Sequence, residues 1–417
     1  MSPVEQDASN NGAHQAASLA ARDAYGRLVA YLAARSRDIA RAEDALGDAF
    51  VAALATWPKG GVPDRPEAWL LAAARRRLVD AARHAKVAAA GAATLGILDD
   101  AHRAVAAEAV FPDERLALLF VCAHPAIDEA ARTPLMLQSV LGLDAERIAS
   151  AFLVAPKTMG QRLVRVKAKI RDAGIRFEIP DPRELPRRLS SVLDAVYAAY
   201  GSGWEDVAGA DPRRRELAED AIWLGRLVVR QLPGEPEAAG LLALMLHCEA
   251  RRAARRDAAG RYVPLDQQDV ALWLRPMIDE AERILAEAAR AGRLGRFQLE
   301  AAIQSAHADR AHTGRTDWEG IALLYEGLLR IAPTIGARVA HAAALAQARG
   351  SGAGLTALDA IAPDVVTAYQ PYWALRAHLL SGLGNAVAAA EAYARAIGLS
   401  EDPAVRDFLA RRAKGDR

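Results

Sequence analysis

The sequence has 417 residues and a formal net charge of +1, with 52% hydrophobic and 25% charged side chains. This length exceeds what a single hydrophobic core can organise and indicates roughly three domains. The near-neutral balance excludes a global field that would attract nucleic acid or a membrane surface, so any polyanion binding must come from local basic clusters.

The cysteine content and the N-terminus bear on the compartment. Two cysteines, Cys122 and Cys248, are too few for a disulfide framework and indicate a reducing environment. The N-terminus, MSPVEQDASNNGAHQ, lacks the basic-then-apolar order of a signal peptide, and no apolar run approaches the roughly 20 residues of a membrane-spanning helix. We therefore expect a cytoplasmic protein.

Helical periodicity dominates the chain. Apolar residues recur at three- and four-residue spacing almost everywhere, and alanine and leucine, both good helix formers, are abundant. The sequence therefore predicts an all-α fold. We expect a polar tail over about residues 1–12, then a helical block over about 13–57 that ends at Trp57-Pro58.

A second predicted helix begins near Pro66, after the loop PKGGVPDRP, because proline suits the first helical position. One face of this helix is apolar. The other face carries a tryptophan among charged residues, namely Trp69, Arg75, Arg76, Asp80 and Arg83. A tryptophan beside arginines is typical of a surface that stacks unpaired bases and holds phosphates. The alternative is that Trp69 belongs to the core, where a lone tryptophan is commonly found.

A basic helix lies further along the chain. Between Pro156 and Arg176 there are seven basic residues, Lys167 among them, against one acid, Asp172. A short helix after Asp144, a turn and this basic helix have the layout of a helix-turn-helix. The buried stripe of the second helix is predicted to be Met159, Leu163, Val166 and Ile170.

The outward face of the same helix is polar near its start. It is predicted to present Lys157, Thr158, Gln161, Arg162 and Arg165, with Lys169 further on. Arginine and glutamine can bond base edges with two hydrogen bonds, whereas Lys169 supplies charge for phosphates. The alternative is a helical hairpin with a solvated basic face.

Several stretches in a fixed order carry a family resemblance. They are AEDALGDAFVAALATWP, GVPDRPEAWLLAAARRRLVDAARH, FPDERLALLFVCAHPAIDEAARTPL and the helix-turn-helix. Together they resemble the extracytoplasmic-function (ECF) class of bacterial sigma factors, and more narrowly the subgroup with a long C-terminal helical-repeat extension. The resemblance covers nearly the whole chain. It implies a promoter-specificity subunit of RNA polymerase with core polymerase and promoter DNA as partners.

The resemblance also implies a domain order. The expected segments are 13–87, which binds core polymerase and the -10 element, 88–111, a linker, 112–176, which reads the -35 element, 177–190, a proline-rich linker, and 191–417, the helical extension.

Individual residues match the family's motifs. Glu43, Asp44 and Asp48 match the acidic helix that docks on the polymerase clamp, and residues 44 and 48, four apart, share one helix face. Gly47 stands where a polar residue is common in the family, which lowers helix propensity there.

Two parts of the sequence match the family features that bind the -10 element. The helix with Arg75, Arg76, Asp80 and Arg83 matches the helix that reads this element, although asparagine is common where Arg76 stands. The preceding loop, with Asp64 and Arg65, matches the loop that captures a flipped base.

The extension contains one convincing repeat. PYWALRAHLLSGLGNAVAAAEAYARAI matches the tetratricopeptide pattern at Trp373, Ala377, Ala389, Tyr393 and Ala396. Because such arrays commonly bind partners, we expect a signalling protein or a ligand on the extension. The alternative is that the array only packs against the DNA-reading domains.

Catalytic and metal chemistry are not expected. Cys122 with His124, and His247 with Cys248, are spaced so that neither pair shares a helix face, so no metal site is predicted. No phosphate-binding glycine loop occurs, so neither an enzyme nor a cofactor is expected. A ligand-sensing helix-turn-helix repressor is the alternative function, and a helical scaffold without DNA binding is a third. The acidic helix and residues 58–84 favour the sigma factor.

Overall fold

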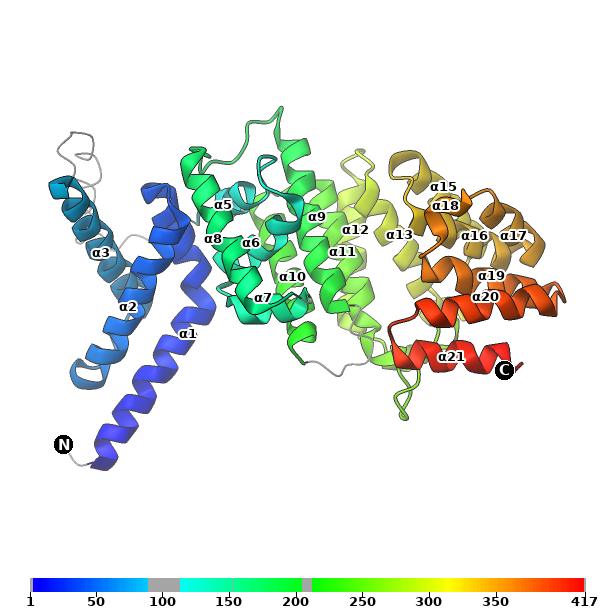
Figure 1. Ribbon diagram of the computed structural model, residues 1–417, viewed down its shortest axis with the longest axis horizontal. Helices are drawn as coiled ribbons and strands as arrows, with labels where there is room; N and C mark the ends of the chain where they lie inside the picture. Colours follow the sequence, from blue (N-terminus) through cyan, green and yellow to red (C-terminus); the bar gives the residue numbers. More distant parts are fainter. Residues whose placement is uncertain (1–2, 89–112, 153, 205–211, 416–417) are drawn as a thin grey trace. The chain divides into compact units, whose positions relative to one another are not determined.

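The computed structural model describes residues 3–88, 113–152, 154–204 and 212–415 (Figure 1). In these ranges every regular element is a helix, which confirms the predicted all-α fold. The chain divides into two compact units, Met1–Ser202 and Gly203–Arg417. The finer domain boundaries derived from the sequence stay predictions.

The first unit opens with three helices, α1 (Pro3–Ser36), α2 (Ile39–Gly60) and α3 (Pro66–Ala88). The prediction of a polar tail is wrong, because α1 already begins at Pro3. The predicted block over 13–57 is also interrupted, since Arg37 has a φ of 56° and the Asp38 side chain caps α2 by accepting from the Arg41 amide.

Two ends of these helices follow from local chemistry. Helix α2 runs past Pro58 and ends before Gly61, whose φ of 84° favours glycine and whose amide donates to the Trp57 carbonyl. Helix α3 begins at Pro66, as predicted. Apolar residues from all three helices are fully buried, among them Leu28, Leu46 and Leu70.

The rest of the first unit is α5 (Arg115–Cys122), α6 (Glu129–Leu141), α7 (Ala145–Ala151), α8 (Pro156–Asp172) and α9 (Leu185–Trp204). Helices α7 and α8 pack together as consecutive helices separated by a short turn. Helix α9 is hydrogen-bonded to α5 and α6. Arg188 of α9 donates to the Phe120 carbonyl of α5 at 3.0 Å, and Thr133 Oγ1 of α6 donates to the Ala195 carbonyl of α9 at 3.1 Å.

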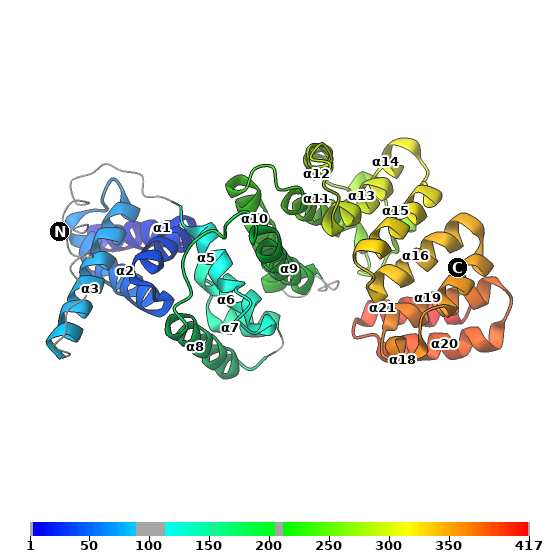
Figure 2. The ribbon, with the colours of Figure 1, turned by 90° about the horizontal axis from the view of Figure 1, so that it is seen from above.

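The second unit is a succession of helices, each packed on helices that lie near it in the chain, such as α11 on both α12 and α13 (Figures 1 and 2). They are α10 (Pro212–Gln231), α11 (Pro236–Ala250), α12 (Arg275–Ala289), α13 (Arg296–Ala308), α14 (Arg310–Thr313), α15 (Trp318–Ile331), α16 (Ile335–Arg349), α17 (Ser351–Asp359), α18 (Pro363–Val366), α19 (Gln370–Gly382), α20 (Ala386–Leu399) and α21 (Pro403–Ala413), with 3-10 turns at Arg252–Arg255, Leu265–Gln267 and Val270–Leu272.

Two features organise the end of this unit. The five residues that match the tetratricopeptide pattern all lie in one hydrophobic cluster formed by α19, α20 and α21. The loop between α11 and α12 reaches the same place, because Arg256 pairs with Asp402 at 2.7 Å and the Tyr262 ring lies edge-on to Phe408. Residues far apart in sequence therefore fix the C-terminal helices.

Candidate functional site

Helix α2 presents an acidic and partly apolar face. Asp44 and Asp48 are exposed, as the sequence predicted from their four-residue spacing, and Val51 beside them is 68% exposed. The Asp48 carboxylate lies 3.9 Å from the Arg77 guanidinium of α3. This face combines two carboxylates with an apolar side chain, a combination that can bind a basic protein surface.

Glu43 points to the opposite side of α2 and differs from its two neighbours. Its side chain is only 14% exposed, pairs with Lys167 of α8 and accepts a hydrogen bond from Ser139 Oγ at 3.0 Å. Burial raises the pKa of Glu43 above its usual value, and the Lys167 charge opposes this rise. In this arrangement Glu43 is not available to a partner protein.

The predicted -10 helix, α3, holds some of its residues against the core. Trp69 is half-buried with its ring edge-on to Trp57, the centroids 5.5 Å apart, so it is not the freely exposed platform expected. Arg75 donates to the Tyr31 hydroxyl, and its guanidinium carbon lies 4.7 Å from the centroid of that ring. Arg76 is exposed.

The remaining predicted residues of this region are on the surface or outside the described part. Asp64 and Arg65 are exposed in the loop between α2 and α3, and Asp80 is exposed on α3. The Arg83 side chain lies outside the described residues.

Helix α8 presents a polar face to solvent. Its exposed residues include Lys157, Thr158, Gln161, Val164, Arg165 and Lys169. Met159, Leu163 and Ile170 are buried as predicted, whereas Val166 is half-buried. Lys167, which the sequence counts with the basic residues, is buried. Sequence reasoning missed Val164, which is 69% exposed and is an apolar side chain on the solvent-facing surface of this helix.

A hollow borders this face. It has a volume of about 360 Å³ and is lined by residues at the start of α6 and along α8. Arg162, Arg165 and Lys169 contribute three positive charges to its wall, and Asp128 one negative charge. The arrangement can hold an anionic group such as a phosphate.

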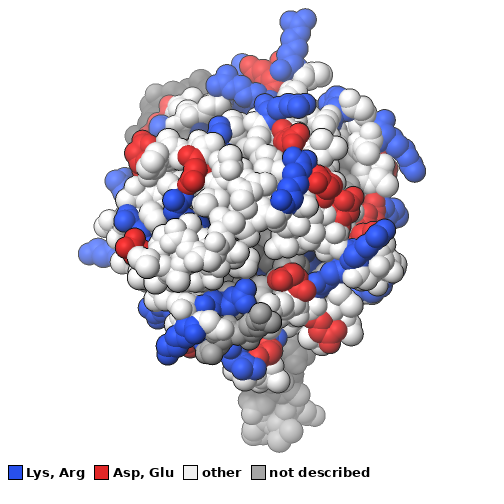
Figure 3. All heavy atoms as spheres, turned by 90° about the vertical axis from the view of Figure 1, so that its right-hand side faces the viewer, with Lys and Arg blue, Asp and Glu red and all other residues white. Residues whose placement is uncertain are grey.

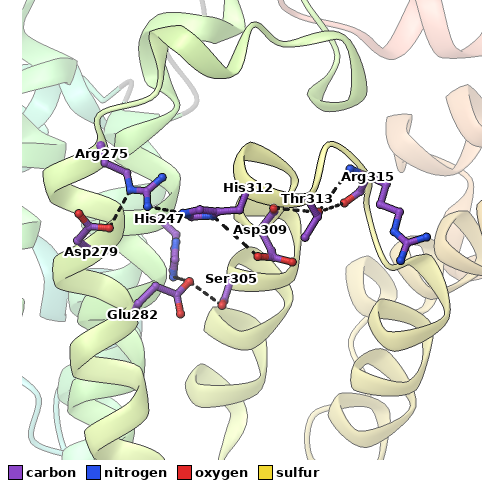
Figure 4. Close-up of polar contacts among 9 residues, drawn as sticks. All are labelled: His247, Arg275, Asp279, Glu282, Ser305, Asp309, His312, Thr313 and Arg315. Atoms are coloured by element: carbon purple, nitrogen blue, oxygen red, sulfur yellow. Dashed lines mark hydrogen bonds and ion pairs between the residues drawn. The ribbon is translucent and has the colours of Figure 1, made fainter.

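Of the cysteines and histidines set aside in the sequence, Cys122 and His247 are buried, whereas His124 and Cys248 are half-buried. Burial raises the pKa of Cys122, so its thiol stays protonated. His247 of α11 is 1% exposed and faces Glu282 of α12, with 3.5 Å between Nε2 and the carboxylate, while Ser305 of α13 donates to the same carboxylate at 2.6 Å (Figure 4). Within the described ranges no three histidine, cysteine, aspartate or glutamate side chains lie close enough together to hold a metal ion.

None of the described helices is both long and apolar enough to cross a membrane.

Two segments of the chain match known family models. Residues 21–87, which cover most of α1 to α3, match the family model "Sigma-70 region 2". Residues 188–289, which cover α9 to α12, match a family of unknown function. No solved structure matches.

An uncharacterized protein of Rhizobium meliloti (strain 1021) is 37% identical over 391 residues, which is 93% of this chain and 91% of that protein. The chain belongs to the family of this protein, and its region 2 module supports a place in the sigma factor family. A region 2 module implies interaction with core RNA polymerase and promoter DNA. It is followed by a large helical C-terminal part, as the sequence predicted.

The buried histidine predicts a pH dependence of stability. Burial lowers the pKa of His247 to about 3 in the folded chain, against about 6.5 when unfolded. Between these values the unfolded state binds the extra proton, so stability is complete above about pH 6.5 and falls as the pH drops toward 3, by up to about 1.4 kcal/mol per unit. His307, whose pKa is lowered to about 4, acts in the same direction.

Urea unfolding between pH 7 and pH 5.5 measures this effect. His247→Gln should make the loss of stability with falling pH shallower, because the glutamine does not titrate. If the stability of His247→Gln falls with pH as steeply as that of the wild type, the pH dependence does not come from His247.

Proposed function

We propose that this protein is an ECF-type sigma factor that binds core RNA polymerase and directs promoter-specific initiation of transcription. The observation that carries the proposal is the region 2 match over α1 to α3. It coincides with an exposed acidic face on α2 and an exposed arginine on α3. The protein acts through binding energy, without catalytic residues or a cofactor of its own.

Core polymerase is the proposed partner of the outward face of α2. Asp44, Asp48 and Val51 share this face, and their mixture of charge and apolar surface suits a basic protein partner. Glu43 joins the contact only after it leaves Lys167, since the two side chains are paired in this structure.

Promoter DNA is the proposed ligand of α3 and α8. At the -10 element Arg76, Asp80, Asp64 and Arg65 form the contacting surface. Trp69 and Arg75 support that surface through Trp57 and Tyr31, and stacking of a base needs only the exposed part of the indole ring.

At the -35 element α7 and α8 act as a helix-turn-helix. Lys157, Thr158, Gln161 and Arg165 face outward and are available to base edges. Arg162 and Lys169 line the hollow beside α6, which suits a backbone phosphate.

The C-terminal extension is proposed to regulate or stabilise the sigma domains through a partner of its own. Its clustered tetratricopeptide residues support a repeat of the partner-binding type. On the face in Figure 3, which looks onto the C-terminal helices, lysine and arginine are interspersed with aspartate and glutamate. Such a surface favours a protein or small ligand over DNA. A ligand-sensing repressor is the weaker alternative, because it needs no region 2 module.

Charge reversal on α2 tests the polymerase contact. The double variant Asp44→Lys, Asp48→Lys should lose co-purification with core polymerase while its helical circular dichroism stays unchanged, because exposed charge reversals seldom destabilise a fold by much. The matched control is Asp364→Lys, Glu391→Lys, two exposed acids of the extension. Equal recovery of polymerase with both variants would overturn the proposed function.

The exposed Val164 tests the -35 assignment. In the major groove only thymine presents a methyl group, so an apolar side chain on the reading helix can distinguish thymine from uracil. Loss of one buried methyl contact costs about 0.8 kcal/mol, or roughly fourfold in affinity. We expect the chain to bind thymine more tightly than deoxyuridine at one -35 position, and Val164→Ala to remove that preference. Binding titrations with single-site substituted DNA measure this. A preference that survives in Val164→Ala would reject the assignment.

A further inference from the structure

A pocket lies inside the second unit, between α10, α11 and α12. Its volume of about 340 Å³ falls in the range of about 300–1,000 Å³ that ligand pockets have. Its walls are the end of α10, the start of α11 and the second half of α12, and α11 packs against both of the other helices (Figure 1). Nearly all of the lining belongs to residues 188–289, the segment that matches a family of unknown function.

Part of the pocket wall is apolar. Val229 of α10, Leu232 in the following turn, Leu242 of α11 and Ile284 of α12 all line it. Leu242 and Ile284 are buried, and the other two are half-buried. Each CH2 group of a ligand that leaves water for such a wall improves its affinity by about fourfold. The wall therefore favours a ligand with an apolar body.

Six charged side chains also line the pocket, and half of them already have partners. Arg226 of α10 donates two hydrogen bonds to the Glu280 carboxylate of α12, at 3.2 and 2.9 Å. The Glu235 carboxylate lies 3.4 Å from the guanidinium of Arg293, which is outside the lining. These pairs satisfy their own charges and leave none for a ligand.

The other three charged side chains are Arg230 of α10 and Arg283 and Glu287 of α12. All three are exposed, and none of them forms an ion pair with another residue in the described part of the chain. Two positive charges therefore stand against one negative charge. The pocket has an excess of one positive charge beside its apolar wall.

The pocket is formed without a ligand. The bonds between Arg226 and Glu280 tie α10 to α12. Helices α10 and α11 approach closely at Gly225, where an added Cβ atom would lie 2.7 Å from the Met245 side chain. A ligand that enters a preformed pocket loses less binding energy to ordering of the protein.

We propose that this pocket binds a small amphipathic carboxylate, which is an organic acid with one carboxylate and an apolar body. The body contacts the apolar wall, and the carboxylate accepts hydrogen bonds from Arg230 and Arg283, whose planar guanidinium groups match its geometry. One excess positive charge suits a monoanion, whereas a phosphate ester carries about two negative charges at pH 7. The role of this site in regulation rests on the proposed function of the extension, but the binding itself does not.

Isothermal titration calorimetry with the full chain tests the site, using probes that share one tail. Octanoate carries a carboxylate, octanol has no charge and octylammonium is positive. Octanoate should bind at least about tenfold more tightly than octanol, because hydrogen bonds between charged groups are the stronger kind. Octylammonium should bind more weakly than octanol. Acetate, which has the carboxylate without the tail, should give no measurable binding.

Variants assign the binding to this pocket. Arg230→Gln and Arg283→Gln should each weaken octanoate binding by about tenfold and leave octanol binding unchanged. Ala239→Phe should weaken the binding of both probes, because residue 239 lines the pocket and the larger ring fills it. The matched control is Arg290→Gln, an exposed arginine just after α12 and outside the lining, which should bind octanoate like the wild type. Circular dichroism checks that each variant is folded.

The results separate the site from the sigma function. The ligand site is overturned if octanoate does not bind, if octylammonium binds as tightly, or if both arginine variants bind octanoate like the wild type. If octanoate binds as expected but the chain does not recover core polymerase, the site stands and the proposed sigma function fails.

Discussion

The pairing of Glu43 with Lys167 is the interaction on which the arrangement of the first unit depends. Both charges are nearly removed from water, and each offsets the cost of burying the other. Ser139 donates a further hydrogen bond to the carboxylate. Because one charge lies on α2 and the other on α8, this pair fixes α2 against α8. Gly26 of α1 adds a steric condition to the same unit, because a Cβ atom there would overlap the Val140 carbonyl oxygen of α6.

The pair also divides the roles of α2 between its two sides. Glu43 faces inward, while Asp44 and Asp48 remain in solvent on the outer side. One short acidic stretch therefore serves an internal contact and, in our proposal, an external one to polymerase. On α8 the division is similar, since Lys167 faces α2 whereas Gln161 and Arg165 face solvent.

The sequence predicted what depends on local chemistry. Helical periodicity, the start of α3 at Pro66 and the buried Met159, Leu163 and Ile170 of α8 follow from spacing and backbone preference. It could not predict the burial of Lys167 or the inward position of Glu43, because both depend on a partner 124 residues away in the chain. The half-burial of Trp69 likewise depends on Trp57, which comes from another helix.

Transcription in vitro with purified core RNA polymerase tests the central claim most directly. On a library of promoter fragments, the full chain should cause initiation at a small set of sites that share sequences at -10 and -35, and core polymerase alone should not use them. Transcripts that are the same with and without the chain would contradict the account.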